Sequence, residues 1–292
     1  MFGIYSRLFP SRRTKPNNER RRSTKEIDIG VEHAVDMARA VIAMVAQYSG
    51  GKPHPRVLEI GPGSDFGAQI ILAGTGAQVA VADRFLAPWQ PGYHPTFYRR
   101  LLAKWRAPCP PLEAVIAAND PRVAITLVAE PTEDLRSIAD RSFDVVLSTA
   151  VLEHVFDLPA AIRELARVTV PGGVNSHQID FRDHRDFERP LEFLLMADTE
   201  FTTLFDRRHG EFGNRWRHCE VSALLRAAGF SIKDMVPNLV AAPEYMTSFL
   251  PKLRALRSPR FAGMSDVELA ILGARFVAVR EGIAFDRKVT TE

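Results

Sequence analysis

The sequence is poor in the features that mark secreted and membrane-spanning proteins. Its 292 residues include two cysteines, Cys109 and Cys219, which lie far apart and form neither a disulfide pattern nor a metal-binding pattern. No segment approaches the about 20 consecutive apolar residues that a membrane span needs. The first nine residues are interrupted by Arg7, which is unlike a signal peptide. These absences predict a protein of the reducing cytoplasm.

A net positive charge is confined to the N-terminal segment. Residues 1–30 contain eight Lys/Arg and three Asp/Glu, whereas the rest of the chain carries a net charge of −2. Residues 10–26 are polar and broken by Pro and Asn, so we expect a flexible arm over 1–30. Its aromatic residues and basic clusters would allow residues 1–25 to make weak contact with an anionic membrane surface, so that the cytoplasmic protein could be peripheral at a membrane. The alternative is a solvated tail. The slightly acidic body argues against a specific nucleic-acid partner.

Helical and strand patterns alternate along the remaining body, 31–292. Helical spacing of apolar residues predicts helices over 31–47, 64–73, 95–106, 158–168 and 220–228. Short apolar runs predict strands over 56–60, 78–83, 123–129, 143–148, 174–181, 230–232 and 274–279. The alternation predicts an α/β fold, in which a mostly parallel, doubly wound sheet of seven strands lies between two helical layers. Residues 86–120 form an insertion, and 185–270 form a variable C-terminal part.

The segment 57–63, Val-Leu-Glu-Ile-Gly-Pro-Gly, is the most informative in the chain. A short apolar strand ends in an acid and a glycine-rich turn, and Asp83 follows Gly63 by twenty residues at the end of the next strand. Glycines let the backbone approach a ligand, and a carboxylate at the next strand tip accepts hydrogen bonds from ribose hydroxyls. A nicotinamide or flavin dinucleotide fold would need a third glycine where Phe66 stands, and Gly67 is one place late. The spacing therefore predicts a nucleoside site that is not of the dinucleotide type.

Four segments resemble, in order and spacing, the motifs of class I methyltransferases that use S-adenosylmethionine (SAM). Residues 57–63 are similar to motif I and 143–155 to motif IV. Residues 165–173, ending in Pro-Gly-Gly, are similar to the helix and turn before the fifth strand, and 226–230 to a later helix end. Together they cover about 55 to 235. The resemblance implies a Rossmann-like fold, methyl transfer as the activity and SAM as the cofactor.

The resemblance also implies which residues hold the cofactor. The backbone of Gly61, Pro62 and Gly63 would hold the amino-acid end of SAM, and Glu59 would favour its ammonium group. Asp83 would bind both ribose hydroxyls.

Further along the chain the implied contacts concern the sugar, the adenine and the sulfonium. Arg84 and Phe85 would lie along the sugar and adenine, and Ser148, Thr149 and Ala150 near the sulfonium. The turn after the third strand departs from the family, because Pro131 stands where an acid usually bonds the adenine amino group. Glu130, Thr132 or a backbone amide could replace that contact, and Thr132 and Glu133 are both predicted to bind the cofactor.

Methyl transfer to a hydroxyl requires a group that removes a proton. Because open α/β sheets bind ligands beyond the carboxyl ends of their strands, we predict catalytic roles for His154, Asp180 and His184. Asp180, Asp183 and His184 could orient a substrate hydroxyl or hold a metal, although no complete set of metal ligands is assigned. The alternatives are a wall position in the cofactor pocket for His154, and a loop cap for the others.

Two aromatic and basic segments are candidates for contact with the acceptor. The insertion begins with 88–100, which is rich in Trp, Tyr, Phe and Arg, and a similar segment spans 207–218. We expect them to form a lid over the acceptor; for the first, the alternative is a helix packed on the sheet edge.

The function predicted from these motifs is SAM-dependent methylation of a small-molecule or glycan-type acceptor, at oxygen. The turn at 148–151, Ser-Thr-Ala-Val, lacks the Asn/Asp-Pro-Pro-aromatic sequence of DNA amino-methyltransferases. An RNA or protein acceptor is not excluded. The alternative from another class is a non-catalytic SAM-fold protein that its basic arm tethers to a partner or membrane.

Overall fold

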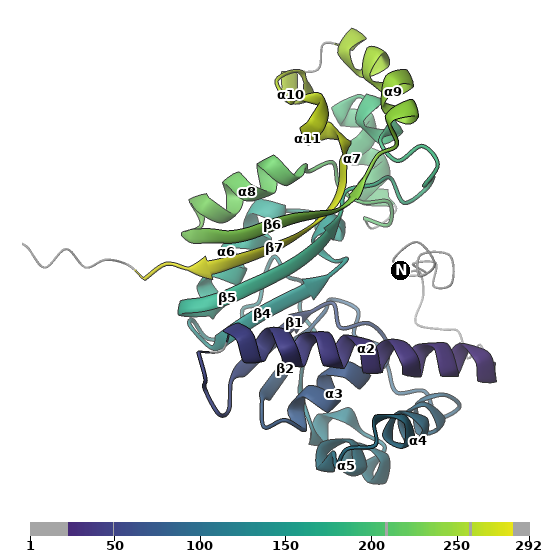
Figure 1. Ribbon diagram of the computed structural model, residues 1–292, viewed down its shortest axis with the longest axis vertical. Helices are drawn as coiled ribbons and strands as arrows, with labels where there is room; N and C mark the ends of the chain where they lie inside the picture. Colours follow the sequence, from purple (N-terminus) through teal and green to yellow (C-terminus); the bar gives the residue numbers. More distant parts are fainter. Residues whose placement is uncertain (1–22, 49, 208–209, 257–258, 283–292) are drawn as a thin grey trace, which may run out of the picture.

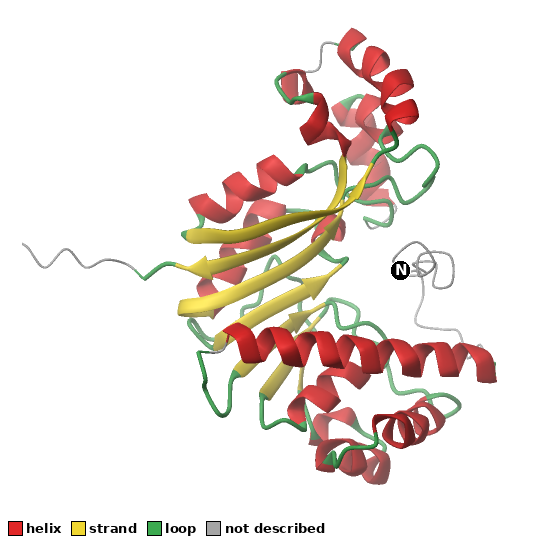
Figure 2. Cartoon of the chain, in the orientation of Figure 1, coloured by secondary structure: helices red, strands yellow, loops and turns green. Residues whose placement is uncertain are grey.

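A seven-stranded sheet forms the centre of the molecule (Figures 1 and 2). The computed structural model describes residues 23–48, 50–207, 210–256 and 259–282. The strands are β1 (Arg56–Ile60), β2 (Gln78–Ala82), β3 (Thr126–Val128), β4 (Phe143–Thr149), β5 (Thr169–Asp180), β6 (Phe230–Val240) and β7 (Ile271–Arg280). Their order is β3-β2-β1-β4-β5-β7-β6. Strands β1 to β5 are parallel, and β7 runs antiparallel between β5 and β6.

Helices cover both faces of this sheet. The α-helices are α2 (Thr24–Tyr48), α3 (Gly67–Ala73), α4 (His94–Trp105), α5 (Pro110–Ala118), α6 (Leu158–Val168), α7 (Asp198–Arg207), α8 (His218–Ala227), α9 (Pro243–Ala255), α10 (Pro259–Ala262) and α11 (Asp266–Ala270). Short 3₁₀ helices are η1 (Pro121–Val123), η2 (Leu152–His154) and η3 (Glu192–Leu195). Because side chains alternate along a strand, Val57 packs toward α2 to α5, whereas Leu58 packs toward α6 and α8. The predicted three-layer α/β fold is confirmed. Among the described residues, no helix combines the length and apolar character that a membrane crossing requires.

A third apolar cluster lies beyond the sheet, where β6 ends and β7 begins (Figure 1). Most of its members come from η3, α7, α9, α10 and α11, and we call the whole group the helical cluster. Six phenylalanines fill it: Phe193, Phe201, Phe205, Phe212, Phe249 and Phe261. The cluster occupies much of the variable part 185–270 and has a core of its own.

The first described helix begins earlier than predicted. Helix α2 starts at Thr24 instead of residue 31, because Ser23 and Glu26 form a reciprocal cap: the Glu26 amide donates to Ser23 Oγ at 3.3 Å, and the Ser23 amide donates to Glu26 Oε2 at 2.7 Å. The predicted arm boundary at residue 30 therefore falls inside a helix. The rest of the arm, 1–22, with most of the predicted membrane-contacting segment, lies outside the described residues.

Several predicted strand boundaries also change: β6 and β7 are longer than expected, and two other differences have a local cause. The strand expected over 123–129 is reduced to β3, because Asp120 accepts a hydrogen bond from the Arg122 amide and begins η1. The turn expected at 171–173 lies within β5, where Gly172 adopts a φ of 78° and the pairing with β4 shifts register. Both changes leave the strand order intact.

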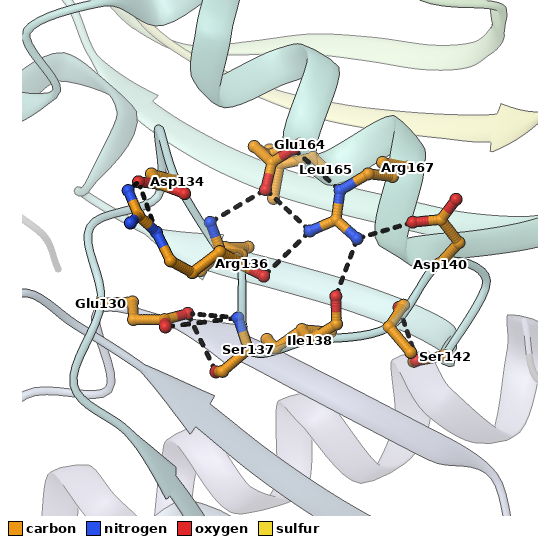
Figure 3. Close-up of polar contacts among 12 residues, drawn as sticks. Glu130, Asp134, Arg136, Ser137, Ile138, Asp140, Ser142, Glu164, Leu165 and Arg167 are labelled. Carbon is orange, nitrogen blue, oxygen red and sulfur yellow. Dashed lines mark hydrogen bonds and ion pairs between the residues drawn. The ribbon is translucent and has the colours of Figure 1, made fainter.

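The connection between β3 and β4, residues 129–142, forms no helix and is held from outside by Arg167 of α6 (Figure 3). Its guanidinium donates to the carbonyls of Leu135 at 2.9 Å and Ile138 at 2.7 Å. Glu164, which pairs with Arg167 at 2.8 Å, accepts the Leu135 amide at 2.9 Å. The loop that passes the cofactor edge is thereby fixed without a covering helix.

Candidate functional site

The carboxyl ends of the five parallel strands meet at one edge of the sheet and surround a small pocket. The pocket measures about 270 Å³. Its lining comes from the segments that follow β1, β2, β3 and β4, namely Ile60, Gly61, Asp83, Arg84, Thr132, Val151, His154 and Val155. Four of the twelve residues predicted for the cofactor line it, together with one residue predicted as catalytic. This is the edge at which open α/β sheets bind ligands.

Gly61 begins the pocket and has no room for a side chain. Its φ is 66°, and a Cβ atom there would lie 2.3 Å from Cγ2 of Val151. The Gly61 amide donates to the Ala82 carbonyl at 2.9 Å, which ties the loop to the end of β2. Gly63 has a φ of 81° with open space around its Cβ position, and Pro62 lies between the two glycines. The backbone of 61–63 is therefore set by left-handed glycines, as a close approach to a ligand requires.

The aromatic residues of the insertion brace this loop from behind. The Tyr98 hydroxyl donates to the Asp65 carbonyl, and His94 Nε2 lies 3.0 Å from the Ser64 carbonyl. Phe97 and Tyr98 are fully buried beside α2. The predicted lid from this segment is therefore wrong, and the alternative of a helix packed at the sheet edge describes α4. The reason is that the aromatic side chains face inward.

Gly67 stands one place after the position of a third motif glycine and packs closely against α2 and α4. A Cβ atom on Gly67 would lie 2.9 Å from Leu101, 3.0 Å from Ala34 and 3.0 Å from Phe97. Phe66 before it is buried and left-handed, with a φ of 55°. The shift of one residue thus moves the glycine contact toward α2 and α4.

Asp83 closes β2 with its carboxylate at the pocket. Oδ1 accepts the Phe85 amide at 2.8 Å, and the Asp83 amide donates to the Val128 carbonyl at 3.1 Å. Oδ2 makes no hydrogen bond with any described residue, so it remains available to ribose hydroxyls. Phe85 does not line the pocket, and 54% of its surface is exposed.

Arg84 and Glu133, both predicted to contact the cofactor, pair with each other. Arg84 Nη2 donates to both carboxylate oxygens at 2.8 and 2.9 Å. The same carboxylate accepts the Phe156 amide at 2.7 Å, and the guanidinium lies 4.7 Å from the Phe156 ring centre. The pair connects the segments after β2, β3 and β4. Arg84 also lines the pocket, whereas Glu133 acts in this structure as a positioning residue.

The turn after β3 presents Thr132 to the pocket. Thr132 is buried there, while Glu130 bonds outside to Ser137, at 3.0 Å from its hydroxyl. Of the two side chains predicted to replace the missing adenine-binding acid, Thr132 lines the pocket and Glu130 does not.

Glu59 lies on the opposite face of β1 from the pocket residue Ile60. Its Oε2 accepts a hydrogen bond from Gln69 of α3 at 2.7 Å, and burial raises the pKa of its carboxyl to about 7. The carboxylate is held against α3, next to the glycine turn.

Ser148 belongs to a buried polar chain that joins β4 and β5. Its Oγ lies 2.8 Å from Nδ1 of His177, whose Nε2 lies 3.2 Å from Oδ1 of Asn175. Burial lowers the pKa of His177 to about 4, so the ring is neutral at pH 7. Thr149 ends β4, and Ala150 adopts a φ of 55° while its amide donates to the Gln178 carbonyl at 2.9 Å. The predicted sulfonium neighbours 148–150 thus shape the turn that carries Val151 into the pocket.

The three residues predicted as catalytic come together. His154 and His184 meet edge to face with ring centres 4.9 Å apart, and His184 Nε2 lies 3.6 Å from Asp180 Oδ2. Nδ1 of His154 lies 2.6 Å from the Gly210 carbonyl. Because His154 also lines the pocket, these polar groups adjoin the place where a cofactor would bind.

Asp180 is ionised and fixed. Burial opposes its ionisation, but Arg182, which bonds both of its oxygens at 2.6 to 3.2 Å, and His184 outweigh that effect and hold the pKa of Asp180 well below its usual range. Asp183 does not join the group, because its carboxylate pairs with Arg185 at 2.6 Å. The predicted cluster 180–184 is therefore divided into two ion pairs.

Sequence reasoning missed several residues that complete this side. Glu153 is buried, and its Oε1 accepts the Asp180 amide at 3.3 Å. Asn214 supports η2 by donating from its side chain to the Leu152 carbonyl at 2.8 Å. Gly210 is required where it stands, since a Cβ there would lie 2.6 Å from the His154 carbonyl oxygen. Gly210 and Asn214 of the segment 207–218 contact η2 beside the pocket, but nothing in the pattern of this segment indicates the partner of His154.

Comparisons with known proteins agree with the site. A family model described as "Methyltransferase domain" matches residues 108–175. A ubiquinone biosynthesis O-methyltransferase of Stutzerimonas stutzeri is 30% identical over 104 residues, 36% of this chain and 43% of that protein. The chain thus aligns with less than half the length of this curated relative.

Solved structures include similar folds. A SAM-dependent methyltransferase from Mesorhizobium loti is 16% identical, with a TM-score of 0.46 over 84% of this chain and 100% of that one. Phosphoethanolamine N-methyltransferase 2 of Haemonchus contortus, solved with SAM, is 18% identical, with a TM-score of 0.45 over 94% of this chain and 62% of that one.

The matched domain agrees with the residue evidence given above. A glycine turn after β1, a carboxylate at the end of β2 and the family match over 108–175 occur on one sheet of order β3-β2-β1-β4-β5-β7-β6. Residues 108–175 match a methyltransferase domain, and Gly61 and Asp83 lie at the sheet edge where the resemblance to class I SAM-dependent methyltransferases implies a SAM site.

Proposed function

We propose that this protein transfers the methyl group of SAM to an oxygen atom of a small-molecule acceptor, for which a glycan hydroxyl is one candidate. The observation that carries the proposal is the position of His154, which lines the pocket of Gly61 and Asp83 and contacts His184. Cofactor and acceptor sites would then share this side chain as a common wall. The similarity to a protein named as an O-methyltransferase supports oxygen as the acceptor atom.

The reaction needs little chemistry from the protein. A lone pair of the acceptor oxygen attacks the methyl carbon, the carbon–sulfur bond breaks with its electrons on sulfur, and S-adenosylhomocysteine leaves. Since the sulfonium already activates the methyl group, the protein mainly aligns the reactants. The hydroxyl proton must leave at the same place, which His154, His184 and the ionised Asp180 adjoin.

Binding of S-adenosylhomocysteine tests the cofactor half of the proposal. Calorimetry should find binding to the wild type that Asp83→Ala weakens by about 10- to 100-fold, the scale of lost hydrogen bonds to a charged group. Asp120→Ala, which removes a carboxylate at the start of η1, is the matched control and should bind as the wild type does. A folded wild type that does not bind would overturn the proposal and favour the non-catalytic, tethered alternative.

A competition among acceptor classes tests the other half. Methyl transfer from labelled SAM would be measured to phenols, catechols, sugars, carboxylic acids and amines at equal concentration. Turnover confined to amines would contradict oxygen as the acceptor atom, and turnover of sugars above phenols would favour the glycan candidate.

A further inference from the structure

Two imidazoles and a carboxylate from separate segments meet beside the cofactor pocket. Glu153 and His154 belong to η2 after β4, and His184 follows β5 by four residues. One ligand atom from each lies within 4.8 Å of the others, and of the described residues these three form the group with metal-ligand spacing. Glu153 is buried, and the two histidines are partly buried.

Neighbouring groups hold these side chains in the manner of a metal site. The Gly210 carbonyl can only accept, so the Nδ1 of His154 at 2.6 Å carries the hydrogen and its Nε2 carries the lone pair. Asp180 stands next to His184, and its own amide donates to Glu153 Oε1 at 3.3 Å. Carbonyl and carboxylate partners of this kind orient histidine ligands in metalloproteins.

One atom of the group lacks a partner. Nε2 of His184 is buried and beyond hydrogen-bond distance of any described acceptor, with Asp180 Oδ2 the nearest acid oxygen at 3.6 Å. Arg182 already engages both oxygens of Asp180. Within the described residues, the His184 ring is held by this longer contact with Asp180 and by ring contacts with His154 and Phe187.

We propose that Glu153, His154 and His184 bind one divalent transition-metal ion, for which Zn²⁺ is the best match, and that its open position takes the acceptor oxygen. Two histidines and one glutamate are a ligand set of catalytic zinc sites, which keep a position for water or substrate. Mg²⁺ and Ca²⁺ prefer oxygen ligands and fit two imidazoles poorly. The role of the ion rests on the proposed methyl transfer, whereas the site itself does not.

The charges are consistent with this role. The ion, the Glu153 carboxylate and an ionised acceptor oxygen sum to zero, because Arg182 already balances Asp180. Binding to the ion would lower the pKa of the acceptor hydroxyl, so that its proton leaves to solvent before the oxygen attacks the methyl carbon. His154 touches both the pocket and the ion site, which would place that oxygen next to the methyl group.

The test is a Zn²⁺ titration of the full chain after removal of metal with a chelator. Competition against a zinc dye should give one ion per chain for the wild type. His154→Ala and His184→Asn should each weaken binding at least 100-fold. His54→Ala, whose ring bonds the Gly76 carbonyl near the other end of the strands, is the matched control and should leave binding unchanged.

Two further measurements distinguish the loss of a metal ligand from misfolding of the variant. The melting transition of each variant, without metal, shows whether its fold persists. The visible spectrum of the Co²⁺-loaded protein reports ligand geometry, and it should change in His184→Asn, in which only a partly exposed side chain is altered. A wild type that takes up no stoichiometric Zn²⁺, or whose affinity and Co²⁺ spectrum are the same in His184→Asn, would overturn the metal site.

The two proposals can fail separately. If the metal-free protein binds S-adenosylhomocysteine but no Zn²⁺, methyl transfer stands and the metal site is wrong. If Zn²⁺ binds as expected while S-adenosylhomocysteine does not, the metal site stands and the proposed reaction is wrong.

Discussion

The pocket side with Gly61 and Asp83 and the proposed acceptor side with His154 and His184 are built in different ways. On the cofactor side, Gly61 and Asp83 each follow directly from a parallel strand, and neighbouring strands bring them together. On the acceptor side, His154 depends on the carbonyl of Gly210, which is 56 residues away in the sequence, and on His184 beyond the next strand. A site made of strand ends is a consequence of the sheet, whereas a site made of loops needs the surrounding packing to exist first.

The two aromatic segments show the same contrast. Both were predicted to cover the acceptor. In α4, Phe97 and Tyr98 turn inward and support the loop at Ser64 and Asp65. The segment that includes Phe212 joins the helical cluster next to His154, with Gly210 as its contact. Two segments of similar composition therefore have different roles: one supports the glycine loop, and the other contacts His154.

The largest expected effect comes from a matched pair of core truncations. Phe97→Ala and Phe249→Ala remove rings that are equally buried, with 0% exposure, on the two sides. Each should lower the free energy of unfolding by about 3–5 kcal/mol because of lost transfer energy and the cavity left behind. Only Phe97→Ala should also weaken S-adenosylhomocysteine binding, since its ring packs on Gly67 below the glycine turn.

Denaturant unfolding and calorimetry on the folded fraction would measure both quantities. Equal losses of affinity in the two variants would mean that the sides are energetically coupled, contrary to the comparison.

Gly61→Ala should have the next largest effect. The new methyl group would lie 2.3 Å from Val151 Cγ2, in a backbone with a φ of 66°. Overpacking and left-handed strain together should cost about 2–4 kcal/mol in stability or cofactor affinity. Gly172→Ala, with a φ of 78° and nothing within 4 Å, carries the strain alone and serves as the control. Thermal melts with and without S-adenosylhomocysteine would compare them, and similar costs would exclude the Val151 contact as the cause.

Glu59→Gln should change how stability depends on pH. The pKa of Glu59 is raised from 4.5 to about 7 in the folded chain, so folding favours the protonated form. The free energy of unfolding should therefore fall as pH rises from about 4.5 to about 7, by up to about 3 kcal/mol, and then stay constant. The variant should lose this slope and be more stable than the wild type above that window.

Urea unfolding at about pH 5 and about pH 8 would measure the effect. Glu244→Gln, on the exposed side of α9, is the control and should keep the wild-type slope. An unchanged slope in Glu59→Gln would show that its carboxyl is ionised in the folded protein.

The smallest effect is expected from Glu133→Gln. The change removes the ion pair with Arg84, whose side chains are 22% and 14% exposed, but leaves an oxygen for the Phe156 amide. Affinity for S-adenosylhomocysteine should fall by about 1 kcal/mol, the range of a partly buried pair. Asp120→Asn removes a pair whose arginine is 72% exposed and should have no measurable effect. Equal results in calorimetry would show that the pair does not hold the pocket.

The sequence by itself determined the class of fold, the succession of strands and helices around the glycine turn, and the positions of Gly61 and Asp83 at strand ends. These follow from local patterns, because apolar periodicity specifies strands and helices, and a glycine turn after a strand has one place in a parallel sheet. Even the early start of α2 was encoded locally, in the cap formed by Ser23 and Glu26. The prediction of this helix was right, and only its first residue was wrong.

Only the tertiary structure decided which polar groups meet. It paired Arg84 with Glu133, and it brought Glu153 into contact with the Asp180 amide. Such contacts join residues that are distant along the chain or face one another only after loops pack, so no spacing rule encodes them. The sequence therefore specifies the proposed cofactor site, at Gly61 and Asp83, through backbone geometry. The proposed acceptor side depends instead on side-chain contacts, which form when the helical cluster packs against the sheet edge.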